Sequence, residues 1–204
     1  RTQMLAAMSH DLRTPLTRLR LRAELVEDSE MQRKMLSDLD EMEAMINATL
    51  AFARDDAQRE PRGPLDLADL LQSLCDDRVD AGHSATYEGP AHATLDGRPV
   101  ALRRAFANLM DNAIAYGGGF TVRLVPDPRN IRVEVDDNGP GIPESEFEKV
   151  FTPFYRLERS RSRDTGGVGL GLSTARTVVR GHGGDITLMN RPEGGLRATV
   201  TLPR

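Results

Sequence analysis

The sequence predicts an α+β protein in which an N-terminal helical hairpin precedes an α/β sandwich. Three features lead to this assignment. Residues 1–57 contain one proline and no glycine, and their apolar residues repeat with helical spacing. Residues 58–64 combine charge with proline and glycine and show no periodicity, which indicates a linker. Residues 65–204 mix helical and alternating patterns, so we expect a second domain there.

The hairpin is predicted from two apolar seams. The first repeats every seven residues, at Leu5, Leu12, Leu19 and Val26. The second runs from Met35 to Ala53 in steps of four and three, after a polar break at residues 28–30. Two helices joined by a short turn run antiparallel and leave part of their apolar stripe in water. A second copy would bury that stripe, so we predict a homodimer whose hairpins form a four-helix bundle.

The second domain combines helices and strands. Helices are expected at about residues 67–80, 98–116 and 170–181, and strands at 120–125, 131–135, 186–189 and 197–202. Short turns, not helical crossovers, join the last strands, so the sheet should be largely antiparallel or mixed. Between Gly139 and Gly171 lies a long segment rich in Gly, Pro, Arg and Ser, with one short helical stretch near 144–150. Segments of this kind are usually lids or binding loops.

Composition excludes several classes of protein. The 204 residues carry a formal charge of −4, which gives no global reason to expect nucleic acid as a partner. Cys75 is the only cysteine, so an internal disulfide and a cysteine-cluster zinc site are excluded, and a cytoplasmic location is expected. No apolar run approaches the roughly 18 residues that span a bilayer, so this chain has no membrane segment. Because it begins with Arg1 and shows no signal peptide, we expect it to be a fragment.

A histidine lies beside a proline in the first helix. Helical geometry places His10 opposite the seam, where it faces water. Pro15 inside a helix costs roughly 3 kcal/mol and loosens the backbone beside His10, which suits a residue that meets successive partners. Asp11 and Thr14 are its polar neighbours. Two simpler interpretations stay open: a solvated surface histidine, and a proline that only bends the helix.

Three polar residues form a rail on the helix expected at 98–116. Asn108, Asn112 and Tyr116 are spaced four apart and share one face. Carboxamide oxygens are ligands that magnesium accepts, and the tyrosine ring could cover a planar base. A solvated helix face is the alternative.

A carboxylate is expected on the buried side of a strand. The inward alternation of residues 131, 133 and 135 continues to Asp137, which precedes Gly139-Pro140-Gly141. A buried carboxylate needs a partner. The exocyclic amine of adenine would be one, and the glycines would let the base approach the backbone. Alternatively, Asp137 caps the glycine turn.

A glycine-rich loop at residues 165–172 (TGGVGLGL) leads into the last expected helix. Loop amides and a helix N-terminus together bind phosphate. The loop lacks the GK[ST] of a P-loop, and its G-x-G-x-G spacing is not the dinucleotide fingerprint. A flexible linker is the alternative.

Together these motifs closely resemble the cytoplasmic core of bacterial sensor histidine kinases, particularly the osmosensor type, over essentially the whole chain. The matching motifs stand in the family's order. They are the phosphoacceptor motif SHDLRTPL from Ser9, the N box NLMDNAIAY from Asn108, the adenine loop DNGPGIP from Asp137, the F box FTPFYR from Phe151 and the lid hinge GVGLGLS from Gly167.

The resemblance implies a fold and a set of roles. The hairpin would be a dimerisation and histidine-phosphotransfer domain, followed by an ATP-binding domain of the gyrase, Hsp90, histidine kinase and MutL type. His10 would be the phosphoacceptor, Asp11 would orient and deprotonate its imidazole, and Thr14 would position water in a phosphatase reaction. ATP and Mg²⁺ would be the cofactors.

For the nucleotide, the resemblance implies roles at ten positions. Asn112 would be the magnesium ligand, Asn108 would contact phosphate, and Tyr116 and Asp137 would contact adenine. The remaining contacts would come from Gly139 and Gly141 beside the base, from Gly167, Gly169 and Gly171 along the triphosphate, and from Arg156 at the γ-phosphate. Many relatives carry Lys or Arg where this chain has Ala115, so one phosphate contact is missing or comes from another residue. Arg103 and Arg104 are candidates for it.

The implied function is autophosphorylation of His10 by ATP, followed by transfer to an aspartate of a response regulator, with phosphatase activity toward that regulator. The native protein would then lie in the inner membrane. Two other classes stay open. A degenerate kinase acting as a dimeric docking module would explain Ala115. An ATP-driven clamp of the gyrase and Hsp90 type has no use for His10, and Asn108 stands where an Hsp90-type clamp carries its catalytic glutamate.

Overall fold

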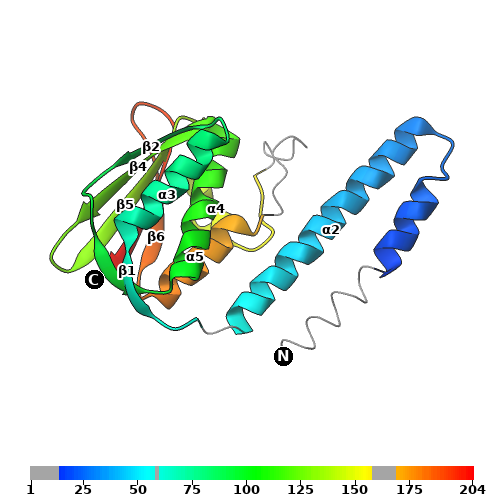
Figure 1. Cartoon of the computed structure of the whole chain (residues 1–204). Helices are drawn as coiled ribbons and strands as arrows, with labels where there is room; N and C mark the ends of the chain where they lie inside the picture. Colours follow the sequence, from blue (N-terminus) through cyan, green and yellow to red (C-terminus); the bar gives the residue numbers. More distant parts are fainter. Residues whose placement is uncertain (1–13, 58–59, 158–168) are drawn as a thin grey trace. The chain divides into compact units, whose positions relative to one another are not determined.

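The computed structural model describes residues 14–57, 60–157 and 169–204. The chain divides into two compact units, Arg1–Arg59 and Glu60–Arg204. Figure 1 shows a helical first unit and a second unit of mixed helix and sheet. The predicted combination of a helical part with an α/β part is therefore confirmed. None of the described helices combines the length and the hydropathy that a bilayer crossing requires.

The described part of the first unit is an antiparallel helical hairpin (Figure 1). A helix over residues 14–23 is followed, after a short turn, by α2 (Ser29–Ala57). Asp28 caps α2, since its Oδ1 accepts hydrogen bonds from the backbone N–H groups of Glu30 at 2.9 Å and Met31 at 3.0 Å. Arg20 joins the two helices through an ion pair with Asp40, at 2.8 Å.

The contact line inside the hairpin differs from the predicted seam. Leu16 and Ala23, which are also seven apart, are buried against Leu39, whereas Leu19 of the predicted seam is 43% exposed. On the second helix Met42 is 47% exposed. Two helices touch along a narrow line that accommodates one stripe from each, so the neighbouring apolar stripe is left at the surface. Leu5 and Leu12 lie outside the described residues.

The second unit is built on a five-stranded sheet. The spatial order of its strands is β2 (Ser84–Glu88), β4 (Gly119–Pro126), β5 (Asn130–Asp137), β7 (Leu196–Pro203), β6 (Asp185–Asn190). β2 and β4 are parallel and the other three pairs are antiparallel, which confirms the predicted mixed sheet.

Three helices lie together on one side of this sheet (Figure 1). They are α3 (Leu67–Asp80), α4 (Pro99–Gly117) and α5 (Gly171–Gly181), close to the predicted ranges. Their apolar faces and the inward residues of the strands form one core, which includes Leu71, Phe106, Val133, Ile186 and Val200. Two short 3₁₀ helices, η1 (Glu144–Glu146) and η2 (Lys149–Phe151), occupy the segment expected to hold a short helical stretch.

A second, two-stranded sheet was not predicted. β1 (Gly63–Asp66) pairs antiparallel with β3 (Thr94–Gly97), so Gly63 and Pro64, which we expected in the linker, belong to the second unit. Proline is tolerated in a strand that has an unpaired edge, because it lacks only one ladder donor. The strand is held by a partner about thirty residues away in the sequence, which local composition does not reveal.

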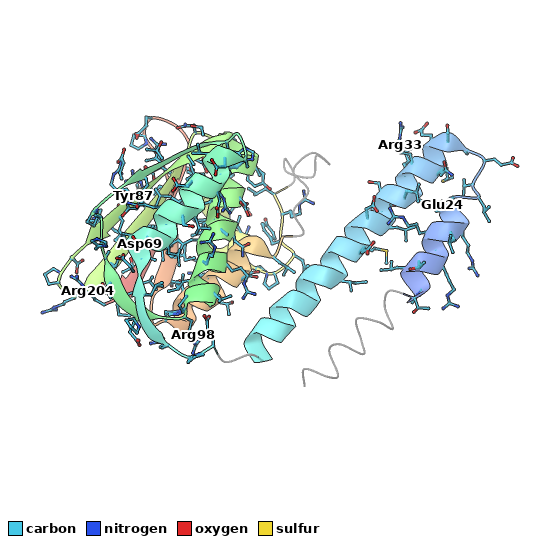
Figure 2. All side chains as sticks on the ribbon, in the orientation of Figure 1. Glu24, Arg33, Asp69, Tyr87, Arg98 and Arg204 are labelled. Carbon is cyan, nitrogen blue, oxygen red and sulfur yellow. The ribbon has the colours of Figure 1, made fainter. Side chains whose placement is uncertain are left out.

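His182 joins the start of α4 to the end of α5. Its imidazole is buried, and its Nε2 accepts a hydrogen bond from the backbone N–H of Arg98 at 3.0 Å. Figure 2 places Arg98 at the start of α4. The Nδ1 atom of His182 donates to the carbonyl of Val178 at 2.7 Å. Burial lowers the pKa of His182, because the charged imidazolium loses its hydration.

Acidification should destabilise the second unit through His182. Because the pKa is lower in the folded state, the unfolded chain takes up the proton first; stability is complete above the unfolded pKa and declines as the pH falls below about 6.5. Chemical unfolding between about pH 8 and about pH 5 should show this decline. His182→Gln, which cannot titrate, should flatten the profile in that window. A profile as steep as that of the wild type would contradict the assignment.

Candidate functional site

The polar rail predicted on α4 borders the core of the second unit. Asn108 and Asn112 are half-buried, whereas Tyr116 is 40% exposed near the end of the helix. Gly118 caps the C-terminal end of the helix: it adopts a left-handed conformation (φ 72°) and donates its N–H to the carbonyl of Ile114. The two asparagines are therefore not part of a fully solvated helix face.

A narrow pocket lies between α4 and the sheet. Its polar side chains are Asn112 and Asp137. The complete lining is Leu109, Asn112, Ala113, Val135, Asp137, Leu172, Leu188, Leu196 and Ala198. Apolar walls with one carboxylate and one carboxamide suit a flat, largely apolar ring that carries a hydrogen-bond donor at its edge.

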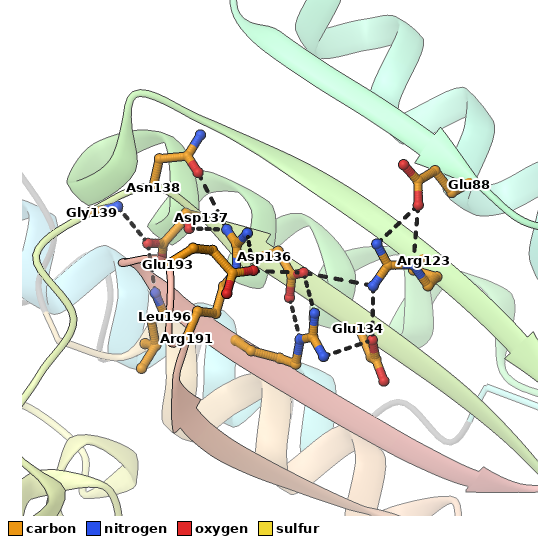
Figure 3. Close-up of polar contacts among 11 residues, drawn as sticks. Glu88, Arg123, Glu134, Asp136, Asp137, Asn138, Gly139, Arg191, Glu193 and Leu196 are labelled. Carbon is orange, nitrogen blue, oxygen red and sulfur yellow. Dashed lines mark hydrogen bonds and ion pairs between the residues drawn. The ribbon is translucent and has the colours of Figure 1, made fainter.

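Asp137 ends β5 and is buried, as the strand alternation predicts. Its Oδ1 accepts hydrogen bonds from the backbone N–H groups of Gly139 at 2.8 Å and Leu196 at 3.0 Å (Figure 3). The carboxylate thus caps the glycine turn, which was the alternative interpretation of the sequence. Since both bonds go to Oδ1, Oδ2 is the atom with which this side chain can accept a hydrogen bond from a ligand.

Two glycines allow the end of α4 to touch the loop that follows β5. A Cβ on Gly139 would lie 2.7 Å from the carbonyl oxygen of Tyr116, and one on Gly117 would lie 2.7 Å from the Cβ of Asp137. Gly141 has a φ of +68°, which disfavours other residues. Sequence reasoning missed Gly117; the run of three glycines after Tyr116 was the available signal.

The start of α5 adjoins the polar rail. A Cβ on Gly171, the first residue of α5, would lie 3.8 Å from the Cβ and Cγ of Asn108. None of the described side chains caps this helix N-terminus, so its first amides can bind an anion. Gly169 has a φ of +78° and its carbonyl accepts from the N–H of Phe154 at 2.9 Å. Gly167 lies outside the described residues.

Arg176 fastens the predicted F box to α5. Its guanidinium lies 4.3 Å from the centre of the Phe151 ring and pairs with Glu148 at 2.6 Å and Asp185 at 2.9 Å. These two carboxylates raise the pKa of Arg176. Arg156, the predicted γ-phosphate contact, is half-buried at the end of this segment.

The two arginines considered as substitutes near the N box differ in surroundings. Arg103 donates to the Oγ of Ser73 at 3.2 Å and to Asp77 at 2.6 Å, so its side chain is directed to α3. Arg104 is one helical turn before Asn108 on the same face of α4. It is half-buried, and burial lowers the pKa of its guanidinium.

The predicted phosphoacceptor residues belong to the first unit. His10 and Asp11 lie outside the described residues, and Thr14 is exposed at the start of the described helix. The second unit gathers the other candidates around the α4 pocket and the start of α5. These are Asn108, Asn112, Tyr116, Asp137, Gly139, Gly141, Gly169 and Gly171.

Both parts of the chain match protein families. Residues 97–204 match the histidine kinase-, DNA gyrase B-, and HSP90-like ATPase family, and residues 1–58 match the His Kinase A (phospho-acceptor) domain. Among solved structures, the mycobacterial sensor histidine kinase MprB aligns with a TM-score of 0.61 and 27% identity, over 70% of this chain and 97% of that one. Full-length ShkA aligns over 98% of this chain and 45% of its own, with a TM-score of 0.70 and 23% identity, which is a likeness of fold.

Curated relatives agree with the family matches. The chain is 43% identical to the sensor histidine kinase GtrS of Pseudomonas aeruginosa over 204 residues, which are 100% of this chain and 42% of GtrS. It is 34% identical to CpxA of Escherichia coli over 213 aligned positions, covering 98% of this chain and 46% of CpxA. It therefore spans less than half of either relative. The predicted class, a protein-histidine kinase that uses ATP with Mg²⁺, is confirmed at the level of the family: the chain belongs to the bacterial two-component sensor histidine kinases and comprises a phosphoacceptor part and an ATPase part.

Proposed function

We propose that this chain binds ATP with Mg²⁺ at the α4 pocket, phosphorylates His10 and transfers the phosphoryl group to an aspartate of a response regulator. The observation that carries the proposal is Asp137, a buried carboxylate whose Oδ1 is held by two backbone amides at the edge of an apolar pocket. A purine with an exocyclic amine complements that pocket, since it supplies a flat apolar body and a donor for Oδ2.

The base and the metal have separate ligands. Tyr116 covers the purine, and Gly139 and Gly141 let the base lie close to the backbone. Asn112 would offer its carboxamide oxygen to Mg²⁺, and the bound ion would supply positive charge that offsets the charge of the triphosphate.

The phosphates lie toward α5. Asn108 donates to them from the rail, and the amides at Gly169 and Gly171, with those of Gly167, bind their oxygens. Arg156 contacts the γ-phosphate. The short distance between Gly171 and Asn108 supports this arrangement, because it brings the start of α5 beside the polar rail of α4.

The transfer step is an in-line displacement. A neutral imidazole nitrogen of His10 attacks the γ-phosphorus, the bond to the β,γ-bridging oxygen breaks, and ADP leaves. Asp11 accepts a hydrogen bond from the N–H of the other ring nitrogen, which fixes the nucleophilic tautomer, and takes up that proton when the new N–P bond makes the ring cationic. Transfer to the regulator reverses the role of His10, which becomes the leaving group. In the phosphatase reaction Thr14 positions the attacking water.

Labelling with γ-labelled ATP and Mg²⁺ tests the proposal directly. Phosphohistidine is acid-labile and alkali-stable, so an acid-labile label on the chain supports the kinase. No label, with ATP still bound, would instead favour the degenerate kinase that acts as a docking module, to which Ala115 points.

The inner-membrane location stays a prediction that cell fractionation would test.

The hairpin is expected to form a homodimer. Its exposed apolar residues include Leu19, Leu25, Met35 and Met42, so part of the apolar surface of the hairpin stays in water. Packing against a second hairpin would bury them. Light scattering at micromolar concentration should give twice the mass of one chain. A monomer under those conditions would contradict the prediction.

Arg104 is proposed to supply the phosphate contact that Ala115 lacks. Arg104→Met should raise the Kd for ATP about tenfold, because one charge-assisted contact to the triphosphate is lost. Arg103→Met is the matched control: that side chain pairs with Ser73 and Asp77, so its loss should leave the Kd unchanged. Calorimetric titration of both variants decides the matter. An unaltered Kd in Arg104→Met would contradict the assignment.

A further inference from the structure

The turn between β6 and β7 is fastened to the loop that follows β5. Asn190 donates from Nδ2 to the carbonyl of Ile142 at 2.8 Å and accepts from its N–H at 3.0 Å. Leu196 donates its N–H to Oδ1 of Asp137, and Arg191 donates to the carbonyl oxygen of the same residue (Figure 3). One turn therefore holds the adenine loop at both of its ends.

Arg191 contacts both the backbone and a side chain of the loop that follows β5. Its Nη1 lies 2.8 Å from the carbonyl oxygen of Asp137 and 3.3 Å from Oδ1 of Asn138. Its Nη2 pairs with Glu193 at 2.9 Å, and its Nε lies 3.8 Å from Asp136. The side chain is largely buried, so these bonds form where water competes little.

Arg191 borders a cluster of ion pairs around Asp136. Asp136, which is 5% exposed, accepts two bonds of 2.6 Å from Arg197, at Nε and Nη2. Glu134 lies beside them, 3.3 Å from Arg197 and 3.2 Å from Arg123. Because adjacent residues of a strand point to opposite faces, the cluster at Asp136 lies across the sheet from the pocket side of Asp137 (Figure 3).

The backbone of the turn is pressed against the same carbonyl group. A Cβ on Gly195 would lie 1.9 Å from the carbonyl oxygen of Asp137, and the residue has a φ of +94°. Only glycine fits there. The carbonyl of Asp137 is thus enclosed by the turn, while two amides hold the carboxylate on the other side.

We propose that Arg191 is a positioning residue for adenine recognition. It does not touch the nucleotide; it fixes the peptide group of Asp137, so that the carboxylate presents one orientation to the exocyclic amine. The proposal rests on the proposed ATP site. It makes the preference for 6-aminopurine nucleotides depend on a side chain beyond the pocket, 54 residues along the chain from Asp137.

The test compares two nucleotides that differ in the amine. The probes are ATP and purine riboside triphosphate, which lacks the 6-amino group, titrated into the whole chain. Arg191→Met should raise the Kd for ATP about tenfold and leave the Kd for the analogue nearly unchanged, so the discrimination ratio falls about tenfold. Arg191→Lys keeps a donor within reach of the Asp137 carbonyl and should recover most of the ratio.

Arg132→Met is the matched control. Arg132 lies on the same strand as Asp137 and pairs with Glu134 at 3.3 Å, without a bond to the adenine loop among the described contacts. Both Kd values should stay at the wild-type level. An unchanged ratio in Arg191→Met, whether both Kd values stay at the wild-type level or rise in parallel, would overturn the proposal. A wild-type chain that binds neither nucleotide would refute the ATP site itself, which separates the two failures.

Discussion

His10→Gln is expected to reduce phosphorylation of the chain to background, a loss of roughly 1000-fold or more, while ATP still binds. Glutamine is close to histidine in size and is polar, but its amide nitrogen is not nucleophilic. The proposed nucleotide site belongs to the second unit, which has its own core. The measurement is acid-labile label from γ-labelled ATP, with the Kd for ATP determined in parallel.

The chain provides a matched control for this variant. His83 is exposed at the end of the segment that follows α3. His83→Gln should therefore retain wild-type labelling. Label that persists in His10→Gln would refute the phosphoacceptor assignment. Loss of label in both variants would point to a general loss of activity and would also count against a specific role for His10.

Asp137→Asn is expected to act on nucleotide binding instead and to raise the Kd for ATP about 100-fold. The asparagine carbonyl can still accept from the N–H groups of Gly139 and Leu196, so the turn is preserved. The amide nitrogen of the asparagine takes the place of Oδ2. It is a hydrogen-bond donor, so it would face the adenine amine, which is also a donor. Removing a hydrogen bond to a charged group costs about 1.5–3 kcal/mol, and the facing donors add to that. Labelling at ATP concentrations below the new Kd should fall in proportion.

Asp127→Asn is the control that separates the loss of a nucleotide contact from the loss of a turn-capping carboxylate. Asp127 lies in the turn between β4 and β5, and its Oδ1 also accepts two backbone N–H bonds, from Arg129 at 2.9 Å and Asn130 at 2.7 Å. The turn lies at the opposite end of β5 from Asp137. This substitution should leave the Kd for ATP unaltered. A wild-type Kd in Asp137→Asn would show that the carboxylate serves only the turn.

Local patterns predicted most of the helices and the central strands. α3, α4 and α5 follow from apolar spacing, and β5 and β7 from alternation, because each pattern reports which side of a single element is buried. The same alternation placed Asp137 on the buried side of β5. Periodicity was less informative inside the hairpin, where Leu16 rather than Leu19 makes the contact. Both residues satisfy a seven-residue repeat, and the choice depends on how the partner helix docks.

The sequence by itself determined the family, the order of the motifs and the residue types suited to a nucleotide. Only the tertiary structure decided how those residues are held. β1 pairs with β3, Gly117 packs against Asp137, and Arg191 binds the carbonyl of Asp137. Each contact joins residues separated by many positions along the chain. Local spacing records the burial of one element, whereas such contacts arise from the packing of several elements together.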